Sequence, residues 1–79
     1  MKAKVYTLKS GTIIRDNREL SLGISIENQS EGIGILCFDK RYGFYVNLKS
    51  NYLVDGNCID FLVRVNELIA DMKEANKLL

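Results

Sequence analysis

Apolar and polar residues alternate most regularly between residues 20 and 27. Aliphatic side chains occupy every second position there, at Leu20, Leu22, Ile24 and Ile26. The positions between them hold only small or polar residues. Because successive side chains of a strand point to opposite faces, this pattern predicts a strand over residues 20–27 with one apolar face.

Other short apolar segments predict further strands in the first 54 residues. β-branched and aromatic residues recur in them between clusters of Gly, Asn, Asp and Ser, which favour turns. We expect these strands at residues 2–9, 12–15, 33–38 and 44–48, with a short edge strand at 52–54. The polar segment 39–43 joins two of them into a hairpin, and Gly43 suits the left-handed position that closes such a turn.

A long amphipathic helix is predicted at the C-terminus, over residues 57–79. Asn57 is a good N-cap for it. Apolar residues at alternating spacings of three and four form one stripe along it, made of Cys58, Phe61, Val65, Leu68, Met72, Ala75 and Leu79. Because this stripe is longer than strands of five or six residues, we expect the last one or two turns to extend beyond the sheet. These turns would expose Met72, Ala75, Leu78 and Leu79.

Together the elements predict a single α+β domain over residues 1–79. A small antiparallel sheet of five or six short strands occupies residues 1–54, and the C-terminal helix packs on one face of it. A chain of 79 residues can bury one core and hardly a second.

The second face of this sheet is also apolar. We expect it to carry Leu36, Phe38 and Tyr45, together with Tyr6 and Leu8. Such a face needs a cover. Closure of the sheet into a small barrel, a second copy of the chain and a different protein are the three alternatives.

The absence of histidine restricts the chemistry open to this chain. It excludes Ser–His and Cys–His nucleophile pairs. Cys37 and Cys58 lack a CxxC spacing and fall short of the four ligands of a structural zinc site, so we expect no metal and no other cofactor. We expect reduced thiols, with a disulfide between the two as the alternative. The acidic residues outside the helix fall in predicted turns or at strand ends, so we expect no catalytic residue and no enzymatic activity.

Charge and hydropathy narrow the choice of partners. Eleven Lys and Arg against ten Asp and Glu give a net charge of +1. This balance lacks the strong positive charge of proteins held mainly by nucleic-acid phosphates. No run approaches the roughly 18 apolar residues of a membrane span, and no apolar segment follows the basic N-terminus. We therefore expect a cytoplasmic protein that does not bind membranes.

Residues 40–46 form the most suggestive binding segment, because two cations and three aromatic residues gather in Lys-Arg-Tyr-Gly-Phe-Tyr-Val. The segment resembles the RNP1 pattern of cold-shock and RRM nucleic-acid binders. The resemblance covers seven residues and implies single-stranded nucleic-acid binding, with Tyr42, Phe44 and Tyr45 stacking on bases. Arg41 stands where the pattern has glycine, and Tyr45 stands where it has an aliphatic residue, which weakens the resemblance.

Protein binding is the preferred hypothesis. Tyrosine and arginine are enriched where proteins bind one another. We expect the binding residues to be Leu36, Phe38, Lys40, Arg41, Tyr42 and Tyr45. The chain would act as a small inhibitor or adaptor by docking on another protein, with a homodimer as an alternative assembly. Its small size and Lys-, Asn- and Ile-rich composition are common among phage and mobile-element proteins, and they identify no family.

Overall fold

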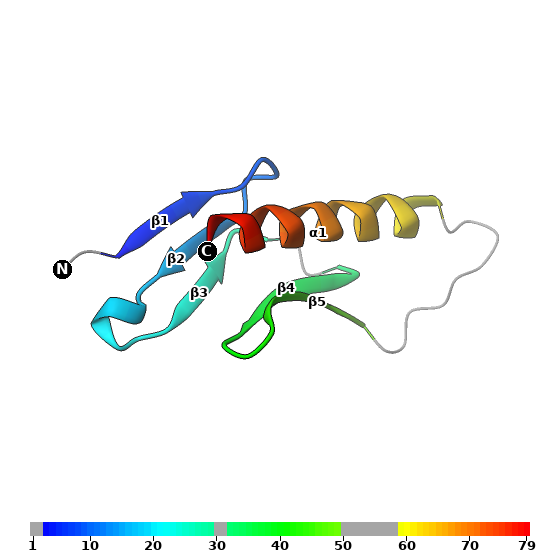
Figure 1. Cartoon of the computed structure of the whole chain (residues 1–79). Helices are drawn as coiled ribbons and strands as arrows, with labels where there is room; N and C mark the ends of the chain where they lie inside the picture. Colours follow the sequence, from blue (N-terminus) through cyan, green and yellow to red (C-terminus); the bar gives the residue numbers. More distant parts are fainter. Residues whose placement is uncertain (1–2, 30–31, 50–58) are drawn as a thin grey trace.

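The chain forms antiparallel sheets and one C-terminal helix packed on them, as predicted for an α+β domain (Figure 1). The computed structural model describes residues 3–29, 32–49 and 59–79. Its elements are β1 (Lys4–Thr7), β2 (Ile13–Asp16), the 3-10 helix η1 (Arg18–Leu20), β3 (Ile24–Glu27), β4 (Gly34–Asp39), β5 (Gly43–Leu48) and α1 (Ile59–Leu78). The edge strand predicted at 52–54, the Asn57 cap and Cys58 lie outside the described residues.

The described strands form two sheets, whereas the sequence predicts one. β1, β2 and β3 make an antiparallel meander in which Ile14 pairs with Tyr6 on one side and with Ile26 on the other. β4 and β5 make a separate two-stranded hairpin. In Figure 1 the helix runs along the hairpin, and its C-terminal end lies beside the meander. One helix therefore packs against two small sheets.

The strand predicted over residues 20–27 is shorter than expected, because only residues 24–27 pair with β2. The carbonyl of Asn17 accepts backbone N–H bonds from both Leu20 and Leu22, at 2.9 and 3.1 Å. Gly23 then adopts a φ of +82°. These local bonds replace the strand ladder. Leu20 and Leu22 consequently leave the expected apolar face, and the Leu22 side chain is 75% exposed.

The predicted hairpin is confirmed, but the prediction that Leu36 and Phe38 lie on an uncovered face with Tyr45 is wrong. The register pairs Phe38 with Phe44 on one face and Cys37 with Tyr45 on the other. The first of these faces points into the core, and Leu36 is only 2% exposed. Phe38 packs against the same core and meets Phe44 edge to face, with ring centroids 4.9 Å apart.

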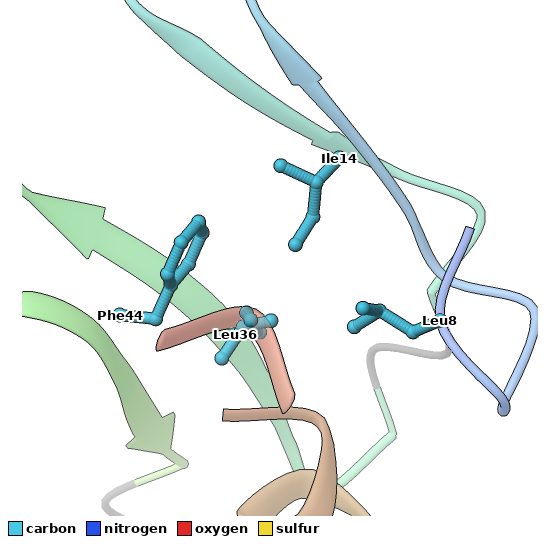
Figure 2. Packing of buried hydrophobic residues seen from close by; sticks show 5 residues of the cluster. Leu8, Ile14, Leu36 and Phe44 are labelled. Atoms are coloured by element: carbon cyan, nitrogen blue, oxygen red, sulfur yellow. The ribbon is translucent and has the colours of Figure 1, made fainter. Parts of the chain in front are cut away.

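The main core is shared by both sheets and the helix. Its buried members are Leu8, Ile14, Leu36, Phe44 and Ala75. Figure 2 shows the side chains from the two sheets pointing toward one another. The expectation that Leu8 and Tyr6 lie on an uncovered face is therefore also wrong, because Leu8 belongs to this core and Tyr6 packs against it. Because the meander and the hairpin face each other, each sheet serves as the cover that the other needs.

The predicted helix is confirmed, but it extends beyond the core at its N-terminal end. Leu68 and Ala75 on the predicted stripe are fully buried, and Met72 is half-buried. At the start of the helix Ile59, Leu62 and Val63 are 72, 51 and 52% exposed. The expected exposure is therefore wrong for Met72 and Ala75, whereas Leu78 and Leu79 are exposed as expected. The reason is that polar contacts in the C-terminal half of the helix, described below, fasten that half to the sheets.

Candidate functional site

The tip of the hairpin projects its side chains away from the core. The backbone N–H of Arg41 donates to Asp39 Oδ1 at 2.7 Å, and that of Tyr42 donates to the Asp39 carbonyl at 3.2 Å. Short Asp side chains favour turns of this kind. The turn leaves Lys40, Arg41 and Tyr42 exposed, with Tyr42 at 79%.

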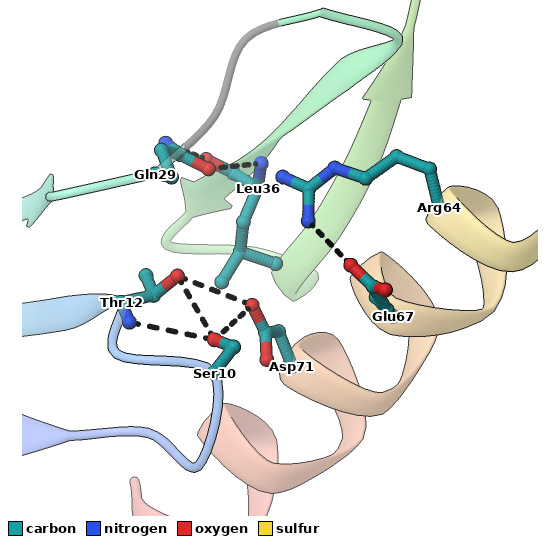
Figure 3. A network of polar contacts seen from close by, with 7 residues as sticks. All are labelled: Ser10, Thr12, Gln29, Leu36, Arg64, Glu67 and Asp71. Atoms are coloured by element: carbon teal, nitrogen blue, oxygen red, sulfur yellow. Dashed lines mark hydrogen bonds and ion pairs between the residues drawn. The ribbon is translucent and has the colours of Figure 1, made fainter. Parts of the chain in front are cut away.

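A side chain from the helix holds the start of β5. Asn76 Oδ1 accepts the Phe44 backbone N–H at 2.9 Å, and Asn76 Nδ2 donates to the Phe44 carbonyl at 3.1 Å. A neighbouring strand would make the same two hydrogen bonds to the backbone N–H and carbonyl of an edge-strand residue. Gln29 makes the same pair of bonds to Leu36 on β4, at 2.9 and 3.2 Å (Figure 3). Both strands that carry the tip are thus fixed by side-chain amides.

Gly43 is required at the end of this turn. Its φ is +84°, and a Cβ atom added there would lie 2.7 Å from Asn76 Oδ1. Both the backbone conformation and this contact oppose any larger residue.

Gly43→Ala is expected to lower the free energy of unfolding by about 1–2 kcal/mol. Urea denaturation followed by circular dichroism measures this change. The loss should be smaller when Gly43→Ala is made in an Asn76→Ala background, because the steric part is then removed. Equal losses in both backgrounds would contradict the contact between residues 43 and 76.

The turn between β2 and β3 lies at the same end of the molecule as the hairpin tip (Figure 1). Arg18 donates from Nε and Nη2 to the two carboxylate oxygens of Asp16, both at 2.8 Å. The guanidinium of Arg18 also lies over the Phe38 ring, 5.8 Å from its centroid. Arg18 therefore links this turn to the strand that leads to the tip.

The bond from Arg18 lowers the pKa of Asp16 to about 2, against the desolvation that raises it. A carboxyl group whose pKa is lower in the folded state stabilises the fold above its unfolded pKa of 3.8. That contribution is lost as the pH falls through about 2. Because Arg18 is half exposed, solvent screening reduces the contribution.

Asp16→Asn is expected to lower the free energy of unfolding by about 1–2 kcal/mol at neutral pH. The difference from the wild type should shrink between pH 4 and pH 2, where the wild-type carboxyl becomes protonated. Urea denaturation across this pH range measures it. The control is Glu19→Gln, because Glu19 is exposed and its ion pair with Lys4, at 3.8 Å, is long and solvated. A difference that persists unchanged below pH 2 would contradict the role of the Asp16 charge.

Tyr45 lies on the outer face of the hairpin and is 42% exposed. The pKa of its phenol is raised, first by electrostatic repulsion from Cys37, its cross-strand partner, and then by desolvation and a hydrogen bond with that thiol. Tyr45 therefore remains a neutral phenol near neutral pH, with an apolar ring and a polar end available at the surface.

Four of the six predicted binding residues are accessible, and we call them the tip surface: Lys40, Arg41, Tyr42 and Tyr45. The other two, Leu36 and Phe38, belong to or pack against the core. The sequence analysis missed the exposure of Leu22 and Leu20 on the neighbouring turn. Gly23 was the available signal, since a glycine inside a predicted strand often marks a break in it.

The burial of Phe44 removes the central aromatic of the nucleic-acid hypothesis. Phe44 is 3% exposed and packs in the core. A base could stack on it only if the hairpin separated from the helix. Of the three proposed stacking residues, only Tyr42 and Tyr45 are accessible.

A second polar cluster joins the β1–β2 turn to the helix (Figure 3). Asp71, which is 4% exposed, accepts hydrogen bonds from the hydroxyls of Ser10 and Thr12 at 2.9 and 3.2 Å. The Lys9 backbone N–H donates to Glu74 at 3.2 Å nearby. The open groove beside this cluster mixes lysines with carboxylates, namely Lys9, Lys73 and Lys77 with Glu67, Asp71 and Glu74. The cluster fastens the helix, and no side chain in it is a strong base that could activate the Ser10 hydroxyl.

Within the part of the chain that the structure describes, no group of three His, Cys, Asp or Glu side chains could hold a metal ion. No described helix is long and apolar enough to cross a membrane. Comparison of the chain with protein-family models, with curated proteins and with solved structures finds no match.

Proposed function

We propose that the chain is a non-enzymatic protein-binding module that uses the tip surface to dock on another protein. It would act as an inhibitor or adaptor by covering part of its target. The observation that carries this proposal is the exposure of Tyr42 and Tyr45 on a hairpin whose backbone is fixed by Asn76. The proposal keeps the cytoplasmic location that the sequence predicts, and it does not require a homodimer.

Aromatic side chains with polar ends bury a large area when they bind, and arginine adds directional hydrogen bonds. The tip surface supplies both kinds of side chain. A surface that is already ordered loses less conformational entropy on binding than a flexible loop does. The two hydrogen bonds between the side-chain amide of Asn76 and the backbone of Phe44 keep β5 ordered next to the tip surface.

Two features support a role without catalysis. The chain contains no histidine. Among the described residues the buried carboxylates are Asp16, which is held by Arg18, and Asp71, which is held by two hydroxyl groups. Both carboxylates therefore serve to position loops.

The test is a comparison of tagged full-length chains incubated with lysate from the native host, with and without nuclease. The variants are Tyr42→Ser/Tyr45→Ser in the tip surface and Leu62→Ser/Val63→Ser at the start of the helix. Each double variant removes two exposed apolar side chains, so both should reduce nonspecific binding of lysate proteins to a similar extent. We expect a protein that the wild type and the helix variant retain and that the tip variant loses by about tenfold or more.

The nuclease arm distinguishes the alternative. Recovery of nucleic acid that depends on Tyr42 and Tyr45, with loss of bound protein after nuclease, would favour nucleic-acid binding instead. Retention that the tip variant shares with the wild type would contradict the proposed surface. Each variant is first shown by circular dichroism to keep the wild-type fold.

A further inference from the structure

The charges around the tip surface identify the chemistry of the partner. We infer that the tip surface binds a protein segment that carries carboxylates together with apolar side chains. This inference rests on the proposed function and adds the composition of the partner to it.

The exposed cations of the hairpin turn are Lys40 and Arg41. Within the described residues no ion pair involves Lys40. Arg41 approaches Asp39 only at 3.9 Å, and its side chain is 76% exposed. The Asp39 carboxylate is occupied in part by the backbone N–H of Arg41 at 2.7 Å. Carboxylates of a partner can therefore reach both cations at little cost in broken bonds.

On the neighbouring β2–β3 turn, Arg18 is held by Asp16 at 2.8 Å, and Glu19 lies 3.8 Å from Lys4 in an exposed ion pair. The hairpin turn itself carries Lys40 and Arg41 against Asp39, an excess of one positive charge. This excess suits a few separate carboxylates. It is too small for a continuous phosphate backbone, whose binding depends on neutralising many charges together.

Exposed apolar groups lie at the same end of the molecule as these cations (Figure 1). The Tyr42 ring is 79% exposed next to Arg41, which lies 5.9 Å from its centroid. Leu22 and Leu20 on the neighbouring turn are 75 and 39% exposed. Large apolar side chains that stay accessible beside charged ones are typical of interaction surfaces. A segment that carried only carboxylates would leave these side chains in water.

The experiment selects binders from a random peptide display library on the immobilised full-length chain. We expect the selected peptides to be enriched in Asp and Glu together with aromatic and aliphatic residues. Lys40→Glu/Arg41→Glu should weaken their binding by about tenfold or more, because each surface ion pair contributes up to about 1 kcal/mol. The matched control is Lys73→Glu/Lys77→Glu, which reverses two exposed lysines on the helix and should leave binding unchanged.

The outcomes separate the inference from the proposed function. Neutral or basic peptides that lose binding on Tyr42→Ser/Tyr45→Ser would overturn the inference and leave the tip surface as a protein-binding site. Peptides that bind the Tyr42→Ser/Tyr45→Ser variant as well as the wild type would overturn both. The inference of an acidic partner would also be overturned if no peptide bound above background. Tighter binding of labelled oligothymidylate than of the peptides would overturn it as well.

Discussion

Leu36→Ala is expected to lower the free energy of unfolding by about 2–5 kcal/mol, the range for a buried leucine truncated in a core. Leu36 is 2% exposed and lies among Leu8, Ile14 and Phe44, so the deleted atoms leave a cavity that both sheets border. Small domains have total stabilities of about 5–15 kcal/mol, so a loss of this size removes a large fraction. Urea denaturation followed by circular dichroism measures it.

The matched control is Leu62→Ala. Leu62 is 51% exposed on the helix, and alanine is a better helix former, so we expect a change within about 0.5 kcal/mol. Comparison of the two variants shows whether Leu36 lies in the core or on the surface. An unchanged stability of Leu36→Ala with weakened partner binding would place Leu36 on the surface, as the sequence analysis predicted, and contradict the core described above.

Local patterns were sufficient to predict the helix and the hairpin. The three- and four-residue spacing of Phe61, Val65, Leu68 and Met72 depends only on helical geometry, and the helix forms where it was predicted. Gly43 likewise adopts the left-handed conformation that the turn needs. Lys40, Arg41 and Tyr42 were predicted correctly as turn residues because short polar turns project their side chains into solvent.

The direction of each hairpin face could not be read from the sequence. Alternation shows that Leu36 and Phe38 share one face and that Ile35 and Cys37 share the other. Both sets are apolar, so the pattern does not say which set meets the core. The position of the meander decides it, because Ile14 and Leu8 approach the face of Leu36. The division into two sheets was missed for the same reason, since strand pairing between distant segments is a tertiary property.

Asn76 illustrates the other kind of miss. An asparagine near the end of an amphipathic helix carries no pattern that distinguishes it from a solvated residue. Its role depends on the hairpin being placed beside the last turns of the helix. The same holds for Asp71, which lies beside the apolar stripe and is buried because Ser10 and Thr12 supply hydroxyl donors.

Asn76→Ala is expected to lower the free energy of unfolding by about 2–3 kcal/mol. The change deletes two hydrogen bonds and leaves the N–H and carbonyl of a nearly buried residue, Phe44, without these partners. Each such loss costs about 1–3 kcal/mol, and the lower half of that range applies because both hydrogen bonds are only partly buried. The higher helix propensity of alanine offsets about half a kcal/mol. Chemical denaturation measures the total. Amide hydrogen exchange at Phe44 measures the local part, which should become faster than in the wild type.

Asn66→Ala is the matched control, because Asn66 is an exposed asparagine of the same helix. It should leave stability unchanged or slightly raised. Asn76→Ala should also weaken binding through the tip surface although residue 76 lies outside it, since a loosened β5 must be reordered when a partner binds. Faster exchange at Phe44 with unchanged partner affinity would show that the tip surface is ordered without Asn76. Equal stability losses in the two variants would show that helix composition, and not the bonds to Phe44, determines the effect.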